Sequence, residues 1–343
     1  MRALVLHAPE DLRIEQRAAD APGAGEVQVR VATGGICGSD LHYFQHGGFG
    51  VVRLREPMIL GHEVSGHVVA CGDGVDDLAE GQLVGISPSR PCGVCEFCQA
   101  GAQNHCLNMQ FYGSAMPFPH IQGAFRDVLT VRRSQCVPAD GLTPGAAALA
   151  EPLSVVLHGA AQAGDLLGRR VLVTGSGPIG VLAVMVARAG GAREIVATDL
   201  NSAPLAFAEQ QGADRAINVA DAEDALAAYA SGKGTFDVHF ECSGAAAALH
   251  AGLECVRPRG TIVQLGLGGD MQVPMLRLTS KEISLKGSFR FHHEYATAIQ
   301  LMQSGRIDVT PLITQTEPVE NAVSAFRIAG DRSQAMKAQI AFS

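Results

Sequence analysis

A glycine-rich turn near the middle of the chain constrains the fold more than any other feature of the sequence. A short apolar run, 171–174, leads directly into Gly175-Ser176-Gly177-Pro178-Ile179-Gly180, and a helix-like stretch follows to residue 189. In a strand–turn–helix unit with this spacing, the first glycine permits a tight turn, the second lets the backbone approach a pyrophosphate, and the third lets the helix pack on the strand. The start of the helix also offers free N–H groups to phosphates. The segment, including Pro178 and Ile179, therefore predicts a dinucleotide-binding turn.

Short apolar runs alternate with helix-like stretches around this turn. The expected strands are 171–174, 195–199, 237–241, 261–265 and 283–287, and the expected helices are 179–189, 203–211, 225–230 and 245–256. Such alternation is typical of parallel βαβ units, whose strands are buried on both faces and should be continuously apolar. We therefore expect an α/β fold of the Rossmann type, a doubly wound parallel sheet.

An acidic residue closes the second of these strands. Asp199 lies about 20 residues beyond the turn, where a carboxylate can accept the ribose hydroxyls of a bound adenosine. The next residues, Leu200-Asn201-Ser202, carry no positive charge for a 2′-phosphate, so the sequence favours NAD over NADP. Cys242, Leu265 and Gly266 lie at the ends of later strands and are further candidate cofactor contacts. The alternative, a plain glycine-rich turn beside a solvated acid, does not account for the strand, the helix and the acid together.

The composition excludes several classes of protein. The 343 residues are 47% hydrophobic and 17% charged, which argues against disorder, and the net charge of −8 argues against nucleic acid or an anionic membrane as the main partner. No apolar run reaches the ~18 residues that span a bilayer, and the N-terminus has no signal-peptide pattern. We therefore expect a cytoplasmic protein whose nine cysteines stay reduced.

Four of the cysteines are clustered, at Cys92, Cys95, Cys98 and Cys106. Four thiolates close the tetrahedral shell of Zn²⁺, which predicts a structural zinc site. An iron–sulfur cluster is a weaker alternative, because the ferredoxin spacing has a shorter last gap and a proline after the final cysteine. A redox pair is weaker still, since it leaves two thiols unexplained.

A second set of candidate ligands is scattered along the chain. Cys37, His62, Glu63 and Glu151 offer a thiolate, an imidazole and carboxylates, the ligands of a zinc site that leaves one position open for substrate. Spacing alone does not join these residues, and a buried cysteine or a histidine in a turn is more often structural. Residues before 146 are β-rich and loop-rich, with strands expected at 27–32, 63–70 and 83–87. After residue 289 we expect a helix over 293–304 and a strand over 337–342.

Together these motifs resemble the zinc-dependent medium-chain dehydrogenase/reductase superfamily, and within it the polyol dehydrogenase branch. The matching segments are residues 35–43, Gly61-His62-Glu63-Val64-Ser65-Gly66, the four-cysteine segment, Glu151-Pro152-Leu153-Ser154 and the glycine turn. The resemblance implies a GroES-like β-barrel catalytic domain over 1–148 with a zinc lobe over 90–108, an NAD-binding domain over 149–289, and a C-terminal segment, 290–343, that returns to the catalytic domain. It also implies two zinc ions per chain and a homo-oligomer, either a dimer or a tetramer.

The resemblance also assigns roles to individual residues. The catalytic zinc would be bound by Cys37, His62 and a carboxylate, either Glu63 or Glu151. Ser39 would pass the alcohol proton to the cofactor ribose, and His42 would pass it on to solvent. Tyr43, Glu151 and Arg290 would hold the substrate, and Arg53 or Arg55 could replace Arg290 as the partner of a substrate carboxylate.

The expected function is that of an oxidoreductase. It would transfer a hydride from a secondary alcohol of a small sugar acid or polyol to NAD. Threonine and 2,3-butanediol are alternative substrates within the same architecture. A relative that has lost its chemistry is disfavoured, because the sequence keeps all the ligand and relay residues.

Overall fold

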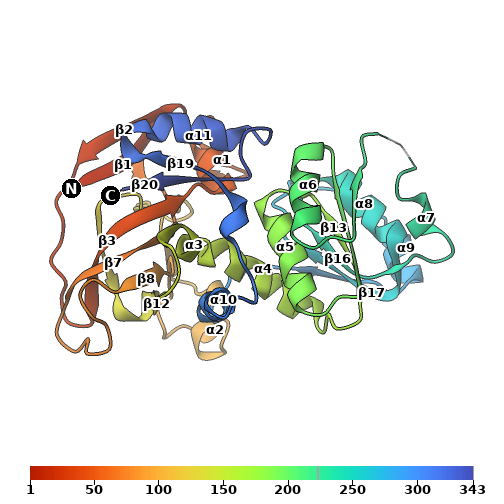
Figure 1. Ribbon diagram of the computed structural model, residues 1–343, viewed down its shortest axis with the longest axis horizontal. Coiled ribbons are helices and arrows are strands. Elements are labelled where there is room, and N and C mark those ends of the chain that lie inside the picture. The colour runs from red at the N-terminus through yellow and green to blue at the C-terminus, as the bar shows by residue number, and fades with distance from the viewer. Residues whose placement is uncertain (222–223, 343) are drawn as a thin grey trace. The chain divides into compact units, whose positions relative to one another are not determined.

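A computed structural model describes residues 1–221 and 224–342, which divide into two compact units (Figure 1). The first unit combines residues 1–151 with 295–343, and the second spans 152–294. The sequence placed its domain boundaries at 148/149 and 289/290, and the breaks between the units fall at 151/152 and 294/295. No helix of the described residues is long and apolar enough to cross a membrane.

The first unit is built on a seven-stranded, mostly antiparallel sheet. Its strands follow the order β12 (Cys136–Pro138), β8 (Leu83–Ile86), β7 (Glu63–Cys71), β3 (Glu26–Gly35), β20 (Lys337–Ala341) and β19 (Ile313–Pro318), with β11 (Val128–Arg132) also paired to β3. The long central strand β3 thus pairs with the C-terminal strand β20, with Gly35 opposite Gln339. The C-terminal segment therefore completes the sheet that the N-terminal residues begin.

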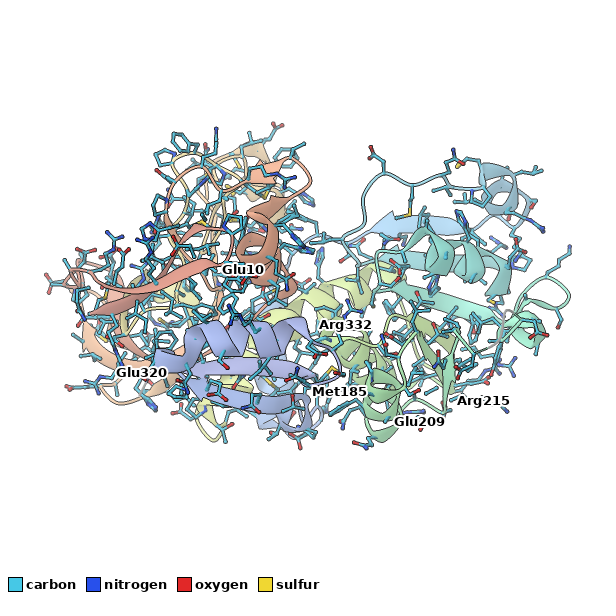
Figure 2. All side chains as sticks on the ribbon, turned by 90° about the horizontal axis from the view of Figure 1, so that it is seen from above. Glu10, Met185, Glu209, Arg215, Glu320 and Arg332 are labelled. Carbon is cyan, nitrogen blue, oxygen red and sulfur yellow. The ribbon has the colours of Figure 1, made fainter. Side chains whose placement is uncertain are left out.

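Shorter elements complete this unit. They are β1 (Arg2–Ala8), β2 (Asp11–Gln16), β4 (Gly48–Phe49), β5 (Val52–Arg53), β6 (Met58–Ile59), β9 (Ser89–Arg90), β10 (Gln110–Phe111), α1 (Gly38–His46), α2 (Glu96–Gln99), α3 (Pro144–Ala148), α4 (Ala150–Ala163, which continues into the second unit), α10 (Glu294–Gln303, which begins at its last residue) and α11 (Ala322–Gly330). Phe44, Phe125 and Phe326 meet in the core, which joins α1 and α11 to the sheet. Two surface ion pairs, Glu10–Arg327 and Arg2–Glu320, join the N-terminal residues to the C-terminal segment. Glu10 and Glu320 are labelled in Figure 2.

The second unit contains the predicted parallel sheet. Its strand order is β15 (Arg215–Asn218), β14 (Glu194–Asp199), β13 (Arg170–Thr174), β16 (Phe236–Glu241), β17 (Val256–Gln264) and β18 (Ser284–Gly287), and all neighbours are parallel. The chain leaves β13 toward β14 and leaves β16 toward β17, in opposite directions. Because parallel crossovers are right-handed, α5 (Pro178–Ala189) and α6 (Ser202–Gln210) cover one face and α8 (Ala246–Cys255) covers the other (Figure 1). The predicted doubly wound sheet is confirmed.

Several elements had not been expected, and two expectations differ from the structure. Helix α1, strands β1, β2 and β15, and helix α9 (Met275–Ser280) were not expected, and the helix expected over 225–230 is only α7 (Ala227–Ala230). Strand β16 is not continuously apolar, because Asp237, His239 and Glu241 alternate along it and are all buried. Each of these side chains has polar partners in neighbouring strands or turns: Arg257 and the Arg170 N–H for Asp237, Thr174 for His239, and several donors for Glu241.

Candidate functional site

Cys37 lies where the central strand β3 gives way to helix α1. The buried Asp40 carboxylate accepts the Cys37 N–H at 3.1 Å and so closes the first turn of the helix. The same carboxylate accepts the Gly61 N–H at 3.1 Å, next to His62. Asp40 therefore holds the two loops that carry Cys37 and His62 in a fixed relation, and its Oδ1 lies 3.7 Å from Nδ1 of His62.

His62 and Glu63 reach Cys37 because β7 pairs with β3. Glu63 is the first residue of β7 and lies opposite Gly35 of β3. A Cβ atom on Gly35 would lie 2.2 Å from a Glu63 carboxylate oxygen, so only glycine leaves room for that side chain. Ligand atoms of Cys37, His62 and Glu63 consequently all lie within 4.8 Å of one another, and Glu151 is not part of this group among the described residues.

A lysine that no sequence motif indicated completes this cluster. Lys337, on β20, is buried and donates to Glu63 Oε1 at 2.7 Å and to the Ile36 carbonyl at 3.0 Å. Its ammonium group also contacts the second oxygen of Glu63. The signal in the sequence is a lysine at the start of a mostly apolar C-terminal strand, which is unusual unless the charge has a partner.

The electrostatics of the cluster call for a cation. Burial, followed by the negative charge of Glu63, raises the pKa of the Cys37 thiol to about 12. Burial raises the pKa of Glu151, in the first turn of α4, to about 8, and Glu63 and Cys37 add to this rise. A divalent cation would reverse both shifts by stabilising the thiolate and the carboxylates. The buried thiol, imidazole and carboxylate fit zinc as a donor set.

The four clustered cysteines also converge. Ligand atoms of Cys92, Cys95, Cys98 and Cys106 lie within 4.8 Å of one another. The N–H groups of Cys92 and Asn108 donate to Sγ of Cys106 at 3.2 and 3.3 Å, and N–H groups of the loop lower the pKa of Cys92 to about 6. N–H donors aimed at sulfur favour thiolates, so this lobe fits a four-thiolate zinc site.

The predicted relay residues lie on helix α1. Ser39 is half-buried and His42 is exposed three residues later, so both lie on one side of the helix. Burial, and then the charge of His46, lowers the pKa of His42. Tyr43 is buried, and its hydroxyl accepts the Ala115 N–H at 3.1 Å. Arg290 belongs to the second unit, where it is half-buried with φ 55° and lies over the Phe289 ring.

The glycine turn has the geometry that its spacing predicts. Gly175 follows β13 with φ 82°, a Cβ on Gly180 would lie 1.8 Å from the Gly175 carbonyl oxygen, and a Cβ on Gly177 would meet nothing within 4 Å. Pro178 opens helix α5, and Ile179 is half-buried beside it. Asp199, at the end of β14, accepts the Ser176 N–H at 2.8 Å and the N–H groups of Leu200 and Asn201 at 2.8 and 3.0 Å. The turn and the acid are therefore adjacent.

The remaining cofactor candidates lie at the same carboxyl edge of the sheet. Cys242 follows β16, and its N–H donates to the Thr174 carbonyl at 2.8 Å. Leu265 and Gly266 follow β17, and both of their N–H groups donate to the Glu241 carbonyl at 2.8 Å. In open α/β sheets this edge is where ligands bind, at the point where the strand order reverses.

A dinucleotide-type sheet and a thiol–imidazole–carboxylate cluster on one chain define the class of metal-dependent dehydrogenases. The family model described as "Alcohol dehydrogenase GroES-like domain" matches residues 23–141, and the one described as "Zinc-binding dehydrogenase" matches residues 178–304. L-idonate 5-dehydrogenase (NAD(P)(+)) of Escherichia coli K12 is 44% identical over 316 residues, which is 92% of this chain and 91% of that protein. Sorbitol dehydrogenase of Gallus gallus is 38% identical over 329 residues, 94% of this chain and 92% of that protein.

The fold comparison agrees with the sequence comparison. The crystal structure of E. coli L-idonate 5-dehydrogenase superposes with a TM-score of 0.95 at 42% identity, covering 99% of this chain and 98% of that one. The chain belongs to the zinc-binding dehydrogenase family. It is an oxidoreductase that uses zinc and NAD(P) and contains a GroES-like domain and a Rossmann-type sheet, as its motifs predicted.

Proposed function

We propose that this enzyme oxidises L-idonate at carbon 5 to 5-keto-D-gluconate, with NAD as hydride acceptor. The observation that carries this is the identity to L-idonate 5-dehydrogenase across both units of the chain. Segments 41–45, 111–116, 286–291 and 329–335 also resemble that enzyme. The balanced reaction converts a secondary alcohol and NAD⁺ to a ketone, NADH and a proton.

For the metal we propose Cys37, His62 and Glu63 as ligands, with Glu151 on the substrate side. The convergence of the first three within 4.8 Å supports this choice over a set that contains Glu151 instead of Glu63. Zinc supplies Lewis acidity at the alcohol oxygen, which lowers the pKa of the hydroxyl. With these ligands, purified Glu63→Gln should lack the zinc ion of this cluster. Glu151→Gln should keep that zinc ion and lose turnover.

The proton leaves along helix α1. Ser39 accepts the proton of the alcohol and passes it through the cofactor ribose to His42, which is exposed and can release it to water. The lowered pKa of His42 keeps its imidazole neutral, and therefore able to accept a proton, at neutral pH. Asp40 closes the first turn of this helix, where Ser39 lies.

The carboxylate of idonate needs a cationic partner, for which we propose Arg290. A guanidinium can bind a carboxylate through two parallel hydrogen bonds. The test is the kinetics of Arg290→Ala on L-idonate and on sorbitol side by side. A larger loss of kcat/KM on idonate supports the carboxylate role, and equal losses on both substrates would exclude it. Arg55→Ala serves as the matched variant, since Arg55 is the alternative cation.

A neutral polyol is the second candidate substrate, because the sorbitol dehydrogenase of Gallus gallus is 38% identical over 94% of the chain. One experiment separates the possibilities. NADH formation is measured with L-idonate, D-gluconate, sorbitol, xylitol, threonine and 2,3-butanediol, with a chelator control. A higher kcat/KM on sorbitol or xylitol than on idonate would overturn the sugar-acid assignment, and the threonine and butanediol arms test the remaining alternatives.

Two wider properties complete the proposal. We infer a cytoplasmic location, because the four thiols of the zinc lobe must stay reduced to bind metal. We also infer a homo-oligomer, because β18 ends the parallel sheet with all four of its residues exposed. For the cofactor we infer a preference for NAD, since Asp199 is oriented by the glycine turn.

A further inference from the structure

A buried acid that the proposed chemistry does not use lies at the end of β16. Glu241 is the last residue of that strand and is 0% exposed. It takes part in no ion pair within residues 1–221 and 224–342, whereas Asp237 on the same strand pairs with Arg257. A fully buried carboxylate without a cation is unusual, so its charge must be stabilised by hydrogen bonds.

Those hydrogen bonds come from the turn that follows β16 and from the end of the neighbouring strand β17. The N–H groups of Ser243 and Gly244 donate to it at 2.8 and 3.0 Å, and the Ser243 hydroxyl and the Gln264 amide also donate to it. Backbone N–H and amide NH₂ groups can only donate, so the acid is an acceptor on both oxygens. An ionised carboxylate, which only accepts hydrogen bonds, fits this set of donors.

The imidazole that is linked to Glu241 through Thr174 supplies no balancing charge. The Thr174 hydroxyl lies 2.8 Å from Nε2 of His239 and 3.4 Å from Oε1 of Glu241. Burial lowers the pKa of His239 to about 3, so its imidazole is neutral. With the proton on Nε2, the imidazole donates to Thr174 and Thr174 donates to Glu241, which directs the whole chain of hydrogen bonds at the carboxylate.

The sheet topology locates this charge relative to the cofactor. The glycine turn follows β13, and Asp199, the adenosine-side acid, follows β14. The strand order reverses between β13 and β16, so the other half of a bound dinucleotide extends over the ends of β16 and β17. The turn after Glu241 contacts the glycine turn directly, because a Cβ on Gly175 would lie 2.8 Å from the Ser243 nitrogen.

We propose that Glu241 is a selector of cofactor redox state. Its buried negative charge favours the cationic nicotinamide of NAD⁺ over the neutral ring of NADH. The hydrogen bonds that stabilise the charge also hold the turn at residues 242–244 against the glycine turn. The consequence for turnover is weaker retention of NADH after the hydride has been transferred.

The test measures cofactor binding without any substrate, so its outcome is independent of the substrate assignment. Dissociation constants for NAD⁺ and NADH are measured by calorimetry on the zinc-loaded wild type and on Glu241→Gln. We expect the ratio Kd(NAD⁺)/Kd(NADH) to rise about tenfold in the variant, the order of magnitude of one partly screened charge–charge interaction. An equal change in both constants would show that Glu241 only shapes the turn and would overturn the proposal.

Matched variants keep the test decisive. Ser243→Ala removes one hydrogen bond to Glu241 but no charge, and it should leave the ratio unchanged. Gln264→Lys places a cation beside Glu241 and should raise the ratio as Glu241→Gln does, whereas Gln264→Met should not. Gln264 is half-buried, so a lysine can be accommodated there. Gln264→Lys therefore provides the test if Glu241→Gln fails to fold. An unchanged ratio in Gln264→Lys would also contradict the proposal.

Discussion

Lys337 shows how much one side chain decides at the metal cluster. Its ammonium group neutralises Glu63 in the structure, and a zinc ion bound by Glu63 would take over part of that task. Removing one partner of a buried ion pair typically costs ~3–5 kcal/mol, because the other charge is left without compensation. The cost should therefore depend on whether zinc is present.

This dependence can be measured with Lys337→Met. We expect the variant to lose about 3 kcal/mol of unfolding free energy relative to wild type when both have been treated with a chelator, and distinctly less when both are loaded with zinc. Denaturant unfolding with and without chelator gives the four values. Lys337→Arg, which keeps the charge, is the control. The same loss in both metal states would show that Glu63 does not bind zinc.

His42 gives a prediction in which the sign of a pKa shift matters. Burial, and then the charge of His46, lowers its pKa below the ordinary 6.5, so the imidazole accepts protons above that lowered value and cannot below it. The rate of alcohol oxidation should rise with pH through this pKa and then level off. His46→Gln removes one cause of the lowering and should move the rise to higher pH.

The control for this prediction is His42→Ala. It should reduce kcat at least tenfold (~10²-fold is typical for a lost proton-transfer group) and abolish the shift produced by His46→Gln. Rates are measured by NADH formation between pH 5 and 9 at saturating cofactor. A rise that stays at the same pH in His46→Gln would remove His42 from the relay.

At the scale of single elements, the four-cysteine lobe and the cluster at the start of helix α1 should lose their zinc ions independently of one another. Metal analysis should find two zinc ions per wild-type chain and one in each of Cys95→Ser and Cys37→Ser, because the two clusters share no ligand. We expect Cys37→Ser to stay folded and inactive, whereas Cys95→Ser should unfold at lower temperature since its lobe has lost its cross-link. Full activity in Cys37→Ser would contradict the catalytic assignment.

The elements also show where sequence reasoning succeeds. The glycine turn, Asp199 and the four cysteines could be predicted because each signal is local: short spacings next to one strand or within one loop. Lys337 could not, because its partner Glu63 is 274 positions away and the contact depends on β20 joining β3. The burial of polar residues on β16 could not be predicted for a related reason: their partners Thr174, Arg257 and Gln264 come from other elements.

At the scale of the whole molecule, the second unit leaves one edge of its sheet unpaired. Among the described strands, β18 pairs only with β17, so its other edge has no strand partner. Leu285 is 37% exposed, and Met275 and Leu276 of the preceding helix α9 are 61% and 81% exposed. Native proteins rarely leave such an edge bare, so pairing with the same strand of a second chain is the expected solution.

This association predicts the mass of the particle in solution. Light scattering on the wild type should give two or four times the 35.8 kDa chain mass, and Leu285→Glu should release smaller particles because it places a charge on the unpaired strand. Leu167→Glu is the matched control: Leu167 belongs to the same unit, is 71% exposed and lies outside β18 and α9, so its mass should stay that of the wild type. A wild-type mass of one chain would show that the protein does not associate. A Leu285→Glu variant that keeps the wild-type mass would show that the subunit contact lies outside β18.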